Sequence, residues 1–215
     1  MTQADTTLGD KAMAPPRLVI FDMDEVLFHY DPAARQAAMG AMAGLDAAEV
    51  ARRVWDSGIE DSSDDGSLDA DGYLRAVGDA LGMRYDRAAW LEGRRCAMRP
   101  NLHTLALARA AKERARIALL TNNGFIMREH FDVLVPQLRP IFGAAMHVAA
   151  EFGTKKPDPD VFRRLVALYD VAPAQAMMID DQARHIAGAR SAGLLGHHFT
   201  GAPGLEAQLR ALALA

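Results

Sequence analysis

The sequence of 215 residues is poor in cysteine, lysine and long apolar runs. Its single cysteine, Cys96, excludes an internal disulfide and fits a reducing compartment, so we expect a buried or inert thiol. No stretch approaches the roughly 20 apolar residues that a membrane-spanning helix needs. The net charge of -4 offers no excess of positive charge, so neither nucleic acid nor a membrane is an expected partner.

The beginning of the chain also lacks a secretory signal. Residues 1–16 are polar and contain no apolar core segment, so we expect a disordered leader and a cytoplasmic protein. Half of all residues are hydrophobic and 24% are charged, which is ordinary for a globular protein that buries a core. Lysine occurs only at Lys11, Lys112, Lys155 and Lys156, which makes the adjacent pair conspicuous.

One stretch near the beginning of the chain carries the strongest chemical signal. The apolar segment 18–21 predicts a buried strand, and it is followed by two carboxylates, Asp22 and Asp24. In an open α/β sheet, ligands bind beyond the carboxyl ends of the strands, so both acids are expected to face a crevice. Two like charges repel there unless a cation, a shared proton or a chemical task holds them together.

The pattern of the remaining chain predicts an α/β protein with a doubly wound parallel sheet. Residues 30–98 are helical in pattern, with no convincing strand, whereas helices and strands alternate beyond residue 102. Strands are predicted at 17–22, 116–121, 144–148, 176–180 and 195–199. We therefore expect a Rossmann-like core domain from residues 17–29 and 99–215, with a helical cap domain, 30–98, inserted after the first strand.

Two features of the predicted cap bear on the site. The acidic stretch 60–67 is expected to be a solvated loop, with Asp69 capping the helix over 70–81. His29 lies where the chain leaves the first motif for the cap, so it is a candidate for lining the substrate entrance.

Four predicted strand ends carry polar residues, and in a parallel sheet these ends converge on one edge. They are Asp22 with Asp24, Thr121-Asn122-Asn123, Lys156 before Pro157, and Asp180-Asp181. The set contains a nucleophilic carboxylate, a second acid, a hydroxyl with backbone amides, a fixed cation, and carboxylates for a hard metal ion. Together these groups are chemically complete for phosphoryl transfer.

These stretches resemble the four motifs of the haloacid dehalogenase-like (HAD) hydrolases. The matching segments are FDMDEV at 21–26, LLTNN at 119–123, GTKKPDPDVF at 153–162 and MIDDQARHIAGARSAG at 178–193. The position of the insert is similar to that in the subfamily with a helical cap. Within that subfamily the chain is most similar to sugar phosphatases typified by alpha-D-glucose-1-phosphate phosphatase.

The resemblance implies a role for each motif residue. Asp22 would attack phosphorus and form an aspartyl-phosphate, while Asp24 would protonate the leaving oxygen and then activate water. Thr121 and the Asn122 amide would hold the phosphate, and Lys156 would offset its charge. The implied Mg2+ ligands are the Asp22 carboxylate, the Asp24 backbone carbonyl and Asp181, with Asp180 supporting through water.

Two residues depart from the family pattern. Glu25 follows the second aspartate, where glycine is usual, and we expect its side chain to point outward. His185 stands where asparagine is common, and we expect it to hold its loop by a hydrogen bond rather than to take part in catalysis.

The sequence therefore predicts a Mg2+-dependent phosphatase that acts on a small phosphorylated metabolite, with no particular oligomeric state implied. A metal-independent 2-haloacid dehalogenase is the nearest chemical rival, although it would need neither Asp24 nor Asp180 and Asp181. The same scaffold would also suit a phosphosugar mutase or a non-catalytic binding protein. Phosphonate hydrolysis is disfavoured because in this family it requires a cap lysine, and residues 30–98 contain none.

Overall fold

In the computed structural model, which describes residues 15–215, five strands form one parallel sheet in the order β5-β4-β1-β6-β7. The strands are β1 (Leu18–Phe21), β4 (Arg116–Thr121), β5 (Met146–Val148), β6 (Ala176–Asp180) and β7 (Leu195–His198). The central strand β1 pairs with β4 on one side and with β6 on the other. The predicted α/β class with a parallel sheet is confirmed.

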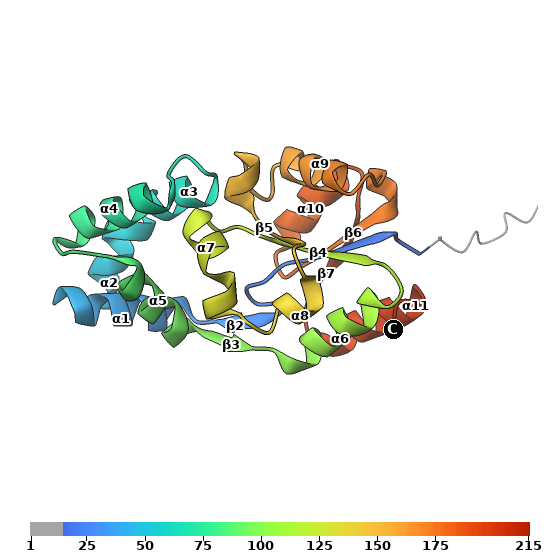
Figure 1. Ribbon diagram of the computed structural model, residues 1–215, viewed down its shortest axis with the longest axis horizontal. Coiled ribbons are helices and arrows are strands. Elements are labelled where there is room, and N and C mark those ends of the chain that lie inside the picture. The colour runs from blue at the N-terminus through green and yellow to red at the C-terminus, as the bar shows by residue number, and fades with distance from the viewer. Residues whose placement is uncertain (1–14) are drawn as a thin grey trace, which may run out of the picture.

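Helices cover both faces of the sheet, as Figure 1 shows. Leu18 and Ile20 of β1 face the cluster formed with α9 and α10, whereas Val19 and Phe21 face the cluster on the opposite side. The core helices are α6 (Leu102–Lys112), α7 (Phe125–Leu134), α8 (Arg139–Phe142), α9 (Pro159–Leu168), α10 (Ala183–Ser191) and α11 (Ala202–Ala211). Because both of its faces are buried, β1 is a continuous apolar run.

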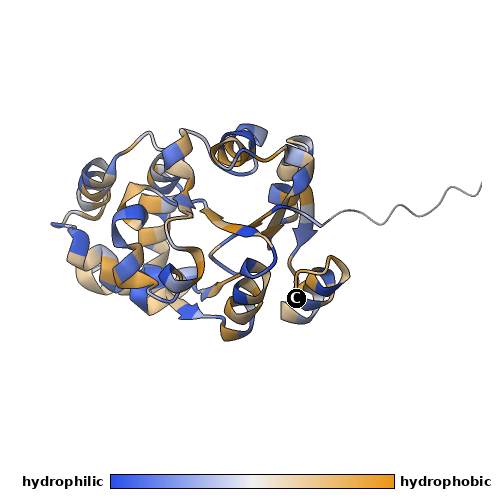
Figure 2. Ribbon diagram, turned by 45° about the vertical axis from the view of Figure 1, so that its right-hand side comes forward, coloured by the Kyte–Doolittle hydropathy of each residue, from blue (hydrophilic) through white to orange (hydrophobic). Residues whose placement is uncertain are grey.

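The distribution of hydropathy matches these layers. Figure 2 shows hydrophobic residues concentrated on the strands, while the helices carry hydrophilic residues on their outer sides. In α9, for example, Val161, Phe162, Leu165 and Val166 are buried, which is the spacing of one face of a helix.

Between β1 and β4 the chain forms a helical region. It contains α1 (Pro32–Ala43), α2 (Ala47–Val50), a π-helical turn (Ala51–Trp55), α3 (Ile59–Asp64), α4 (Ala70–Leu81) and α5 (Arg87–Ala97). Aspartates cap four of its helices, and Asp69 caps α4 as predicted, since its Oδ1 accepts a hydrogen bond of 2.7 Å from the Gly72 amide. The helix predicted over 70–81 is confirmed at both of its ends.

Between Tyr30 and Met98 the chain is helical, as predicted, but the two short strands that border this region were not predicted. Strands β2 (Phe28–Tyr30) and β3 (Met98–Pro100) pair antiparallel where the chain enters and leaves the helical region. Three residues are too few to show the alternation of a strand, and the pairing joins segments that are far apart in the sequence. The two crossings between the core and the helical region are therefore tied to each other.

The prediction of a loop over 60–67 was wrong in part, because α3 occupies its first half. This short helix packs closely on the core. A Cβ atom added at Gly124 would lie 2.0 Å from the Ser63 Oγ, and one added at Gly66 would lie 2.6 Å from the Ala150 carbonyl oxygen. Tertiary contact of this kind stabilises a helix that its own sequence does not favour.

Three expectations from the sequence concern the surface of the molecule. Within residues 15–215, no helix combines the length and the apolar character needed to cross a bilayer. Cys96 is exposed rather than buried, while desolvation and the nearby Glu92 carboxylate raise the pKa of its thiol, which keeps it protonated. The predicted leader, residues 1–16, lies outside the described residues except for Pro15 and Pro16.

Candidate active site

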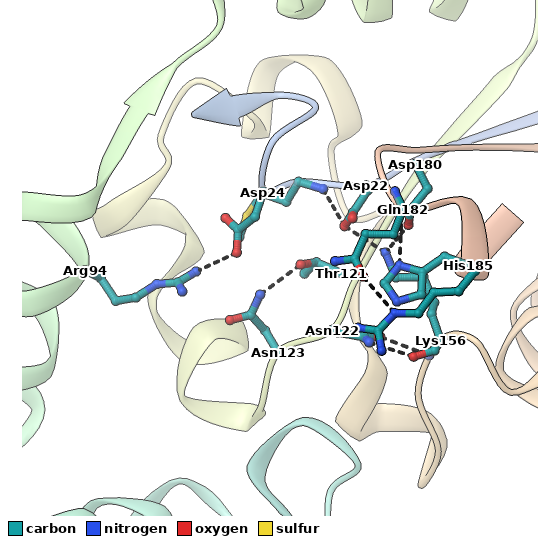
Figure 3. Close-up of polar contacts among 12 residues, drawn as sticks. Asp22, Asp24, Arg94, Thr121, Asn122, Asn123, Lys156, Asp180, Gln182 and His185 are labelled. Carbon is teal, nitrogen blue, oxygen red and sulfur yellow. Dashed lines mark hydrogen bonds and ion pairs between the residues drawn. The ribbon is translucent and has the colours of Figure 1, made fainter. Parts of the chain in front are cut away.

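The register of the sheet brings the predicted site residues together. Phe21 pairs with Leu119 on one side and with Ile179 on the other, so Asp22 and Asp180 occupy neighbouring positions at the end of the sheet. Thr121 ends β4 at the same edge. Figure 3 shows these side chains converging with those of Asn122, Lys156 and His185. The convergence predicted from the strand ends is thus a feature of the fold.

Lys156 lies between two of the carboxylates. Its Nζ is 2.8 Å from Asp22 Oδ1 and 2.6 Å from Asp180 Oδ2, and its side chain is 0% exposed. A buried ammonium is stable only when it is paired and hydrogen-bonded, and here two anions provide both conditions. Asp22 Oδ1 also accepts a 2.7 Å hydrogen bond from the Met23 amide, so both of these contacts fall on the same carboxylate oxygen.

The environment shifts the pKa values of Asp22, Asp180 and Lys156 in different ways. Burial raises the pKa of Asp22, and the attraction of Lys156 only partly offsets this effect. Burial acts in the same direction on Asp180, but Lys156 and His185 outweigh it and hold the pKa of Asp180 well below its usual range. The pKa of Lys156 is raised because its two anionic partners outweigh its desolvation. Asp22 is therefore the carboxylate that would gain most from an additional positive charge.

The loop after β4 is connected to this cluster by amide side chains. The Asn122 side chain donates to the Lys156 carbonyl at 2.8 Å and accepts from the Lys156 amide at 3.0 Å, which fixes the backbone beneath the ammonium. The Asn123 side chain donates to Thr121 Oγ at 2.8 Å. The Thr121 oxygen accepts this hydrogen bond, so the hydroxyl hydrogen points elsewhere and can be donated to a ligand.

Both carboxylate oxygens of Asp180 already have partners within the protein. Its Oδ1 accepts a hydrogen bond from the Gln182 amide at 2.8 Å and lies 2.9 Å from Nδ1 of His185, while Oδ2 contacts Lys156. His185 therefore holds the beginning of α10 by a hydrogen bond, the contact expected from the sequence. Asp22, Asp180 and His185 offer ligand atoms within 4.8 Å of one another, but the Lys156 ammonium is bound to both carboxylates.

The charges at this edge leave room for a divalent cation. Asp24 pairs with the buried Arg94, whereas Asp22, Asp180 and Asp181 share one buried cation, that of Lys156, so negative charge is in excess. Partial burial and the neighbouring Asp180 raise the pKa of Asp181, which is the sign of an anion lacking a partner. Carboxylate and carbonyl oxygens are the ligands that Mg2+ prefers. The donors fit a hard metal ion that Asp22 and Asp181 would hold.

Glu25 occupies a backbone position that normally requires glycine. Its φ is +61°, in the left-handed region, which costs free energy for a residue with a side chain. The carboxylate accepts a hydrogen bond of 2.6 Å from the Tyr30 amide at the end of β2. Glu25 is exposed, as expected, but its side chain also connects the turn after Asp24 to the strand that leads into the helical region.

The site opens into a cavity of about 400 Å³ between the core and the helical region. The core contributes Asp22, Asp24, Thr121, Asn122, Lys155, Lys156 and Asp181, and the other side contributes Tyr30, Asp61 and Asp64. Asp61 is paired with Lys155 across the cavity. Burial and the nearby Glu60 raise the pKa of Asp64 well above the usual range of an aspartate.

Behind the cavity wall, a residue of α5 reaches the site. The Arg94 guanidinium Nη2 lies 3.3 Å from Asp24 Oδ2, and Figure 3 shows the Asp24 side chain directed toward it. Sequence reasoning did not identify Arg94, Tyr30 or Asp64 as site residues, and it placed Asn123 at a polar strand end without giving it a role. A signal for Arg94 was present, since it follows Trp90 by four residues on the buried face of α5, where an arginine is unusual.

His29 does not join this group. It is exposed on β2 and lines a separate hollow with Glu25, Asn101 and Asp181, which adjoins the cavity. This location gives no support to the prediction that His29 contacts the substrate.

Comparison with known proteins places the chain among hydrolases. A family model described as haloacid dehalogenase-like hydrolase matches residues 16–193. A HAD-like family hydrolase from Porphyromonas gingivalis has a similar structure, with a TM-score of 0.78 and 17% identity over 92% of this chain and 99% of the other. Among curated proteins, none matches the chain significantly.

Two further solved structures are similar in fold: one is a complex with magnesium and phosphate, and the other is a dehalogenase. A HAD family enzyme from Bacteroides thetaiotaomicron, in complex with magnesium and inorganic phosphate, has a TM-score of 0.72 and 16% identity over 85% of this chain and 93% of the other. The L-2-haloacid dehalogenase from Xanthobacter autotrophicus has a TM-score of 0.59 and 18% identity, over 84% and 76%. At such identities the likeness shows the fold and not the reaction.

Proposed function

The chain belongs to the haloacid dehalogenase-like hydrolase family, and we propose that it hydrolyses a small phosphomonoester, such as a sugar phosphate, with the help of Mg2+. The observation that carries this proposal is the buried Lys156 ammonium, 2.8 Å from the Asp22 carboxylate and 2.6 Å from that of Asp180. An anionic carboxylate can approach an anionic phosphate only where fixed positive charge offsets their repulsion.

Asp22 is the proposed nucleophile. Its Oδ1 is held by the Met23 amide and by Lys156, so Oδ2 is left to attack the phosphorus atom. The attack forms an aspartyl-phosphate and releases the alcohol, and water then hydrolyses this intermediate to inorganic phosphate. Asp24 donates a proton to the leaving oxygen in the first step and takes one from the water in the second.

Three core groups would bind the phosphoryl oxygens. The Thr121 hydroxyl, oriented by the Asn123 amide, donates its hydrogen, and the backbone amide of Asn122 provides a second donor. Lys156 offsets the charge while it keeps Asp22 in place. Donors fixed in this way stabilise charge that develops in the transition state without having to rearrange.

A Mg2+ ion would be held by the Asp22 and Asp181 carboxylates, with the Asp24 backbone carbonyl as a further oxygen ligand, and would neutralise charge on the transferred phosphoryl group. The raised pKa of Asp22 supports this assignment, because a nucleophile must be ionised and the charges of residues 15–215 leave it short of positive partners. Asp180 is proposed to act mainly by fixing Lys156 and His185.

The size and polarity of the cavity support a small, hydroxylated substrate. A volume of about 400 Å³ accommodates a metabolite but not a polymer. The wall opposite the nucleophile carries Tyr30, Asp61 and Asp64, whose oxygens suit hydroxyl groups. A sugar phosphate meets both conditions.

Dehalogenation is the rival reaction that shares the nucleophile. It would leave Asp24, its partner Arg94 and the excess of acidic groups without a task. A mutase would return the phosphoryl group to a second sugar position, and a non-catalytic binder would retain phosphate without turnover.

Purified protein should release phosphate from p-nitrophenyl phosphate and from a panel of phosphorylated metabolites with Mg2+, and lose activity in EDTA. Asp22→Asn should lower kcat by at least about 10³-fold because the nucleophile is removed. Asp160→Asn, the same change at an exposed carboxylate on α9, should leave activity unchanged.

Four outcomes would contradict the proposal. Activity without metal, or full activity of Asp22→Asn, would refute the mechanism. Chloride release from 2-chloropropionate would identify a dehalogenase, and transfer of phosphate to a second position on a sugar phosphate would identify a mutase.

A further inference from the structure

Arg94 has no role in the chemistry derived above, yet it is the residue of the helical region that contacts a reacting carboxylate. It lies on α5, its side chain is 3% exposed, and its guanidinium is 3.3 Å from Asp24 Oδ2. Within residues 15–215, this is the one hydrogen bond that the Asp24 carboxylate makes. Burying an arginine is costly, so a contact of this kind requires an explanation.

Arg94 is itself held in place by the strand that leads out of the core. Its guanidinium carbon lies 4.8 Å from the centre of the Tyr30 ring, a distance that allows a cation–π interaction. The Tyr30 amide donates to Glu25 Oε1 at 2.6 Å. Glu25 comes directly after Asp24, so Asp24, Arg94, Tyr30 and Glu25 form a closed ring of contacts across the junction.

The two oxygens of Asp24 are in different states. Oδ2 is occupied by Arg94, whereas Oδ1 is enclosed and has no hydrogen-bond partner among the described residues. Arg94 does not line the cavity, while Asp24 and Tyr30 do. Arg94 is therefore placed to act on the substrate only through Asp24.

The direction of the Asp24 side chain fits the reaction. Figure 3 shows its carboxylate directed toward Arg94 and away from the cluster of Lys156, Asp180 and His185. An in-line displacement by Asp22 expels the leaving oxygen on the far side of the phosphorus atom, toward the helical region. A carboxylate turned to that side meets the oxygen that it has to protonate.

We propose that Arg94 is a positioning residue, which holds Asp24 where it can protonate the leaving group once the helical region covers the cavity. The inference rests on the proposed phosphatase function. Acid–base catalysis then depends on a residue that lies outside the core. Asp24 is in position to donate its proton only when α5 is packed against the core.

The test compares two leaving groups. p-Nitrophenolate departs without help from an acid, whereas the alkoxide of glycerol 2-phosphate requires a proton. Arg94→Met should lower kcat/KM for glycerol 2-phosphate by roughly 10- to 100-fold and that for p-nitrophenyl phosphate by less than about 3-fold, because general acid catalysis contributes about 10² to 10⁴. Arg94→Lys, which keeps the charge but not the planar fork, should lie between wild type and Arg94→Met.

Two controls and one substitute variant make the result decisive. Asp24→Asn should show the same preference for the good leaving group, and more strongly. Arg35→Met removes another buried arginine, which pairs with Glu60 and donates to the Tyr30 hydroxyl but makes no contact with Asp24, and should change both substrates by the same factor. If Arg94→Met does not fold, as judged by circular dichroism, the comparison is made with Arg94→Lys.

The outcomes separate this inference from the proposed function. If Asp24→Asn does not discriminate between the leaving groups, the assigned acid is wrong and the proposed mechanism fails. If Asp24→Asn discriminates but neither Arg94 variant does, the mechanism stands and the role of Arg94 is refuted. An equal rise in KM for both substrates in Arg94→Met would also refute it, since that result indicates substrate binding or a general loss of structure.

Discussion

At the core end of the cavity Lys156 bridges Asp22 and Asp180 at 2.8 and 2.6 Å, whereas at the opposite end Arg94 contacts Asp24 at 3.3 Å. The core groups are held by four adjacent parallel strands, β5, β4, β1 and β6, and the loops that follow them. The other end is formed by helices that join the core through two short strands, β2 and β3, through ion pairs, and through apolar packing and the close contact of α3.

This difference suits the two ends of the cavity to two different tasks. Groups that stabilise the transition state must not move, and strand ends in a buried sheet provide that rigidity. Groups that admit and enclose a substrate must be able to separate, and contacts made by a helical insert provide that freedom. We therefore expect changes at the core end to cost more than changes at the junction, and changes within the helical region to cost least.

The largest effect is expected at Lys156. Lys156→Met leaves two buried carboxylates without their cation and should lower the free energy of unfolding by about 3–5 kcal/mol. Adding Mg2+ should restore part of this loss, because the ion replaces the missing positive charge. Urea unfolding with and without Mg2+ measures both effects.

Lys155→Met is the matched control at the neighbouring position. Its ammonium pairs with the exposed Asp61, so the cost should stay below about 1 kcal/mol. Equal costs for the two lysines would mean that the core end is no more tightly built than the surface beside it.

An intermediate effect is expected where α3 meets the core. In Gly124→Ala, the new methyl group would lie 2.0 Å from Ser63 Oγ, so α3 must move, at a cost of about 1–3 kcal/mol. Because α3 can move while β4 holds Thr121, competitive inhibition by inorganic phosphate should be little changed while the KM for a substrate enclosed by the helical region rises. Urea unfolding and inhibition kinetics test this expectation.

Gly204→Ala in α11 adds a methyl group whose nearest neighbour, Thr200 Oγ1, lies 4.0 Å away, so it serves as the control, with no loss of stability or activity expected. A weaker inhibition by phosphate in Gly124→Ala would show that the two ends of the cavity are mechanically coupled.

The smallest effect is expected at Asp64, within the helical region. Burial and Glu60 raise its pKa in the folded protein, so its contribution to stability is present below the ordinary range of an aspartate and is lost as pH rises through the raised value. Asp64→Asn should therefore stabilise the protein at pH 7 by on the order of 1 kcal/mol, and the gain should vanish toward pH 4.

The adjacent Asp65 predicts the opposite sign. Burial raises the pKa of Asp65 slightly, but hydrogen bonds from Ser67 outweigh it and the pKa is lowered, so its contribution is present at neutral pH and lost on acidification. Asp65→Asn should be mildly destabilising at pH 7. Thermal unfolding of both variants between pH 4 and pH 8 distinguishes the two signs.

Much of the architecture follows from local patterns in the sequence. β4 and β6 have the predicted bounds, because a continuous apolar run that stops at polar residues is a signal contained within the strand. Aspartates and prolines likewise indicate where helices begin, as at Pro32 after Asp31 and Pro159 after Asp158. The convergence of Asp22, Thr121, Lys156 and Asp180 then follows from the topology of a parallel sheet.

Other features arise only from contacts between distant segments. Arg94 and Asp24 are separated by 70 positions, and their contact depends on how α5 is placed over the core. The pairing of β2 with β3 and the helical state of α3 depend on the same placement, which no local period encodes. The exposed position of His29, at the same junction, could not be predicted for the same reason.

The sequence by itself therefore determined the sheet and the order of its polar strand ends, because periodicity, capping and topology are properties of short segments. Only the tertiary structure decided which oxygen of Asp22 is held by its neighbours and that Asn123 orients the Thr121 hydroxyl. It also decided that an arginine from the helical region holds Asp24. Hydrogen bonds of this kind depend on positions within a few tenths of an ångström, and those are set by the packing of the whole chain.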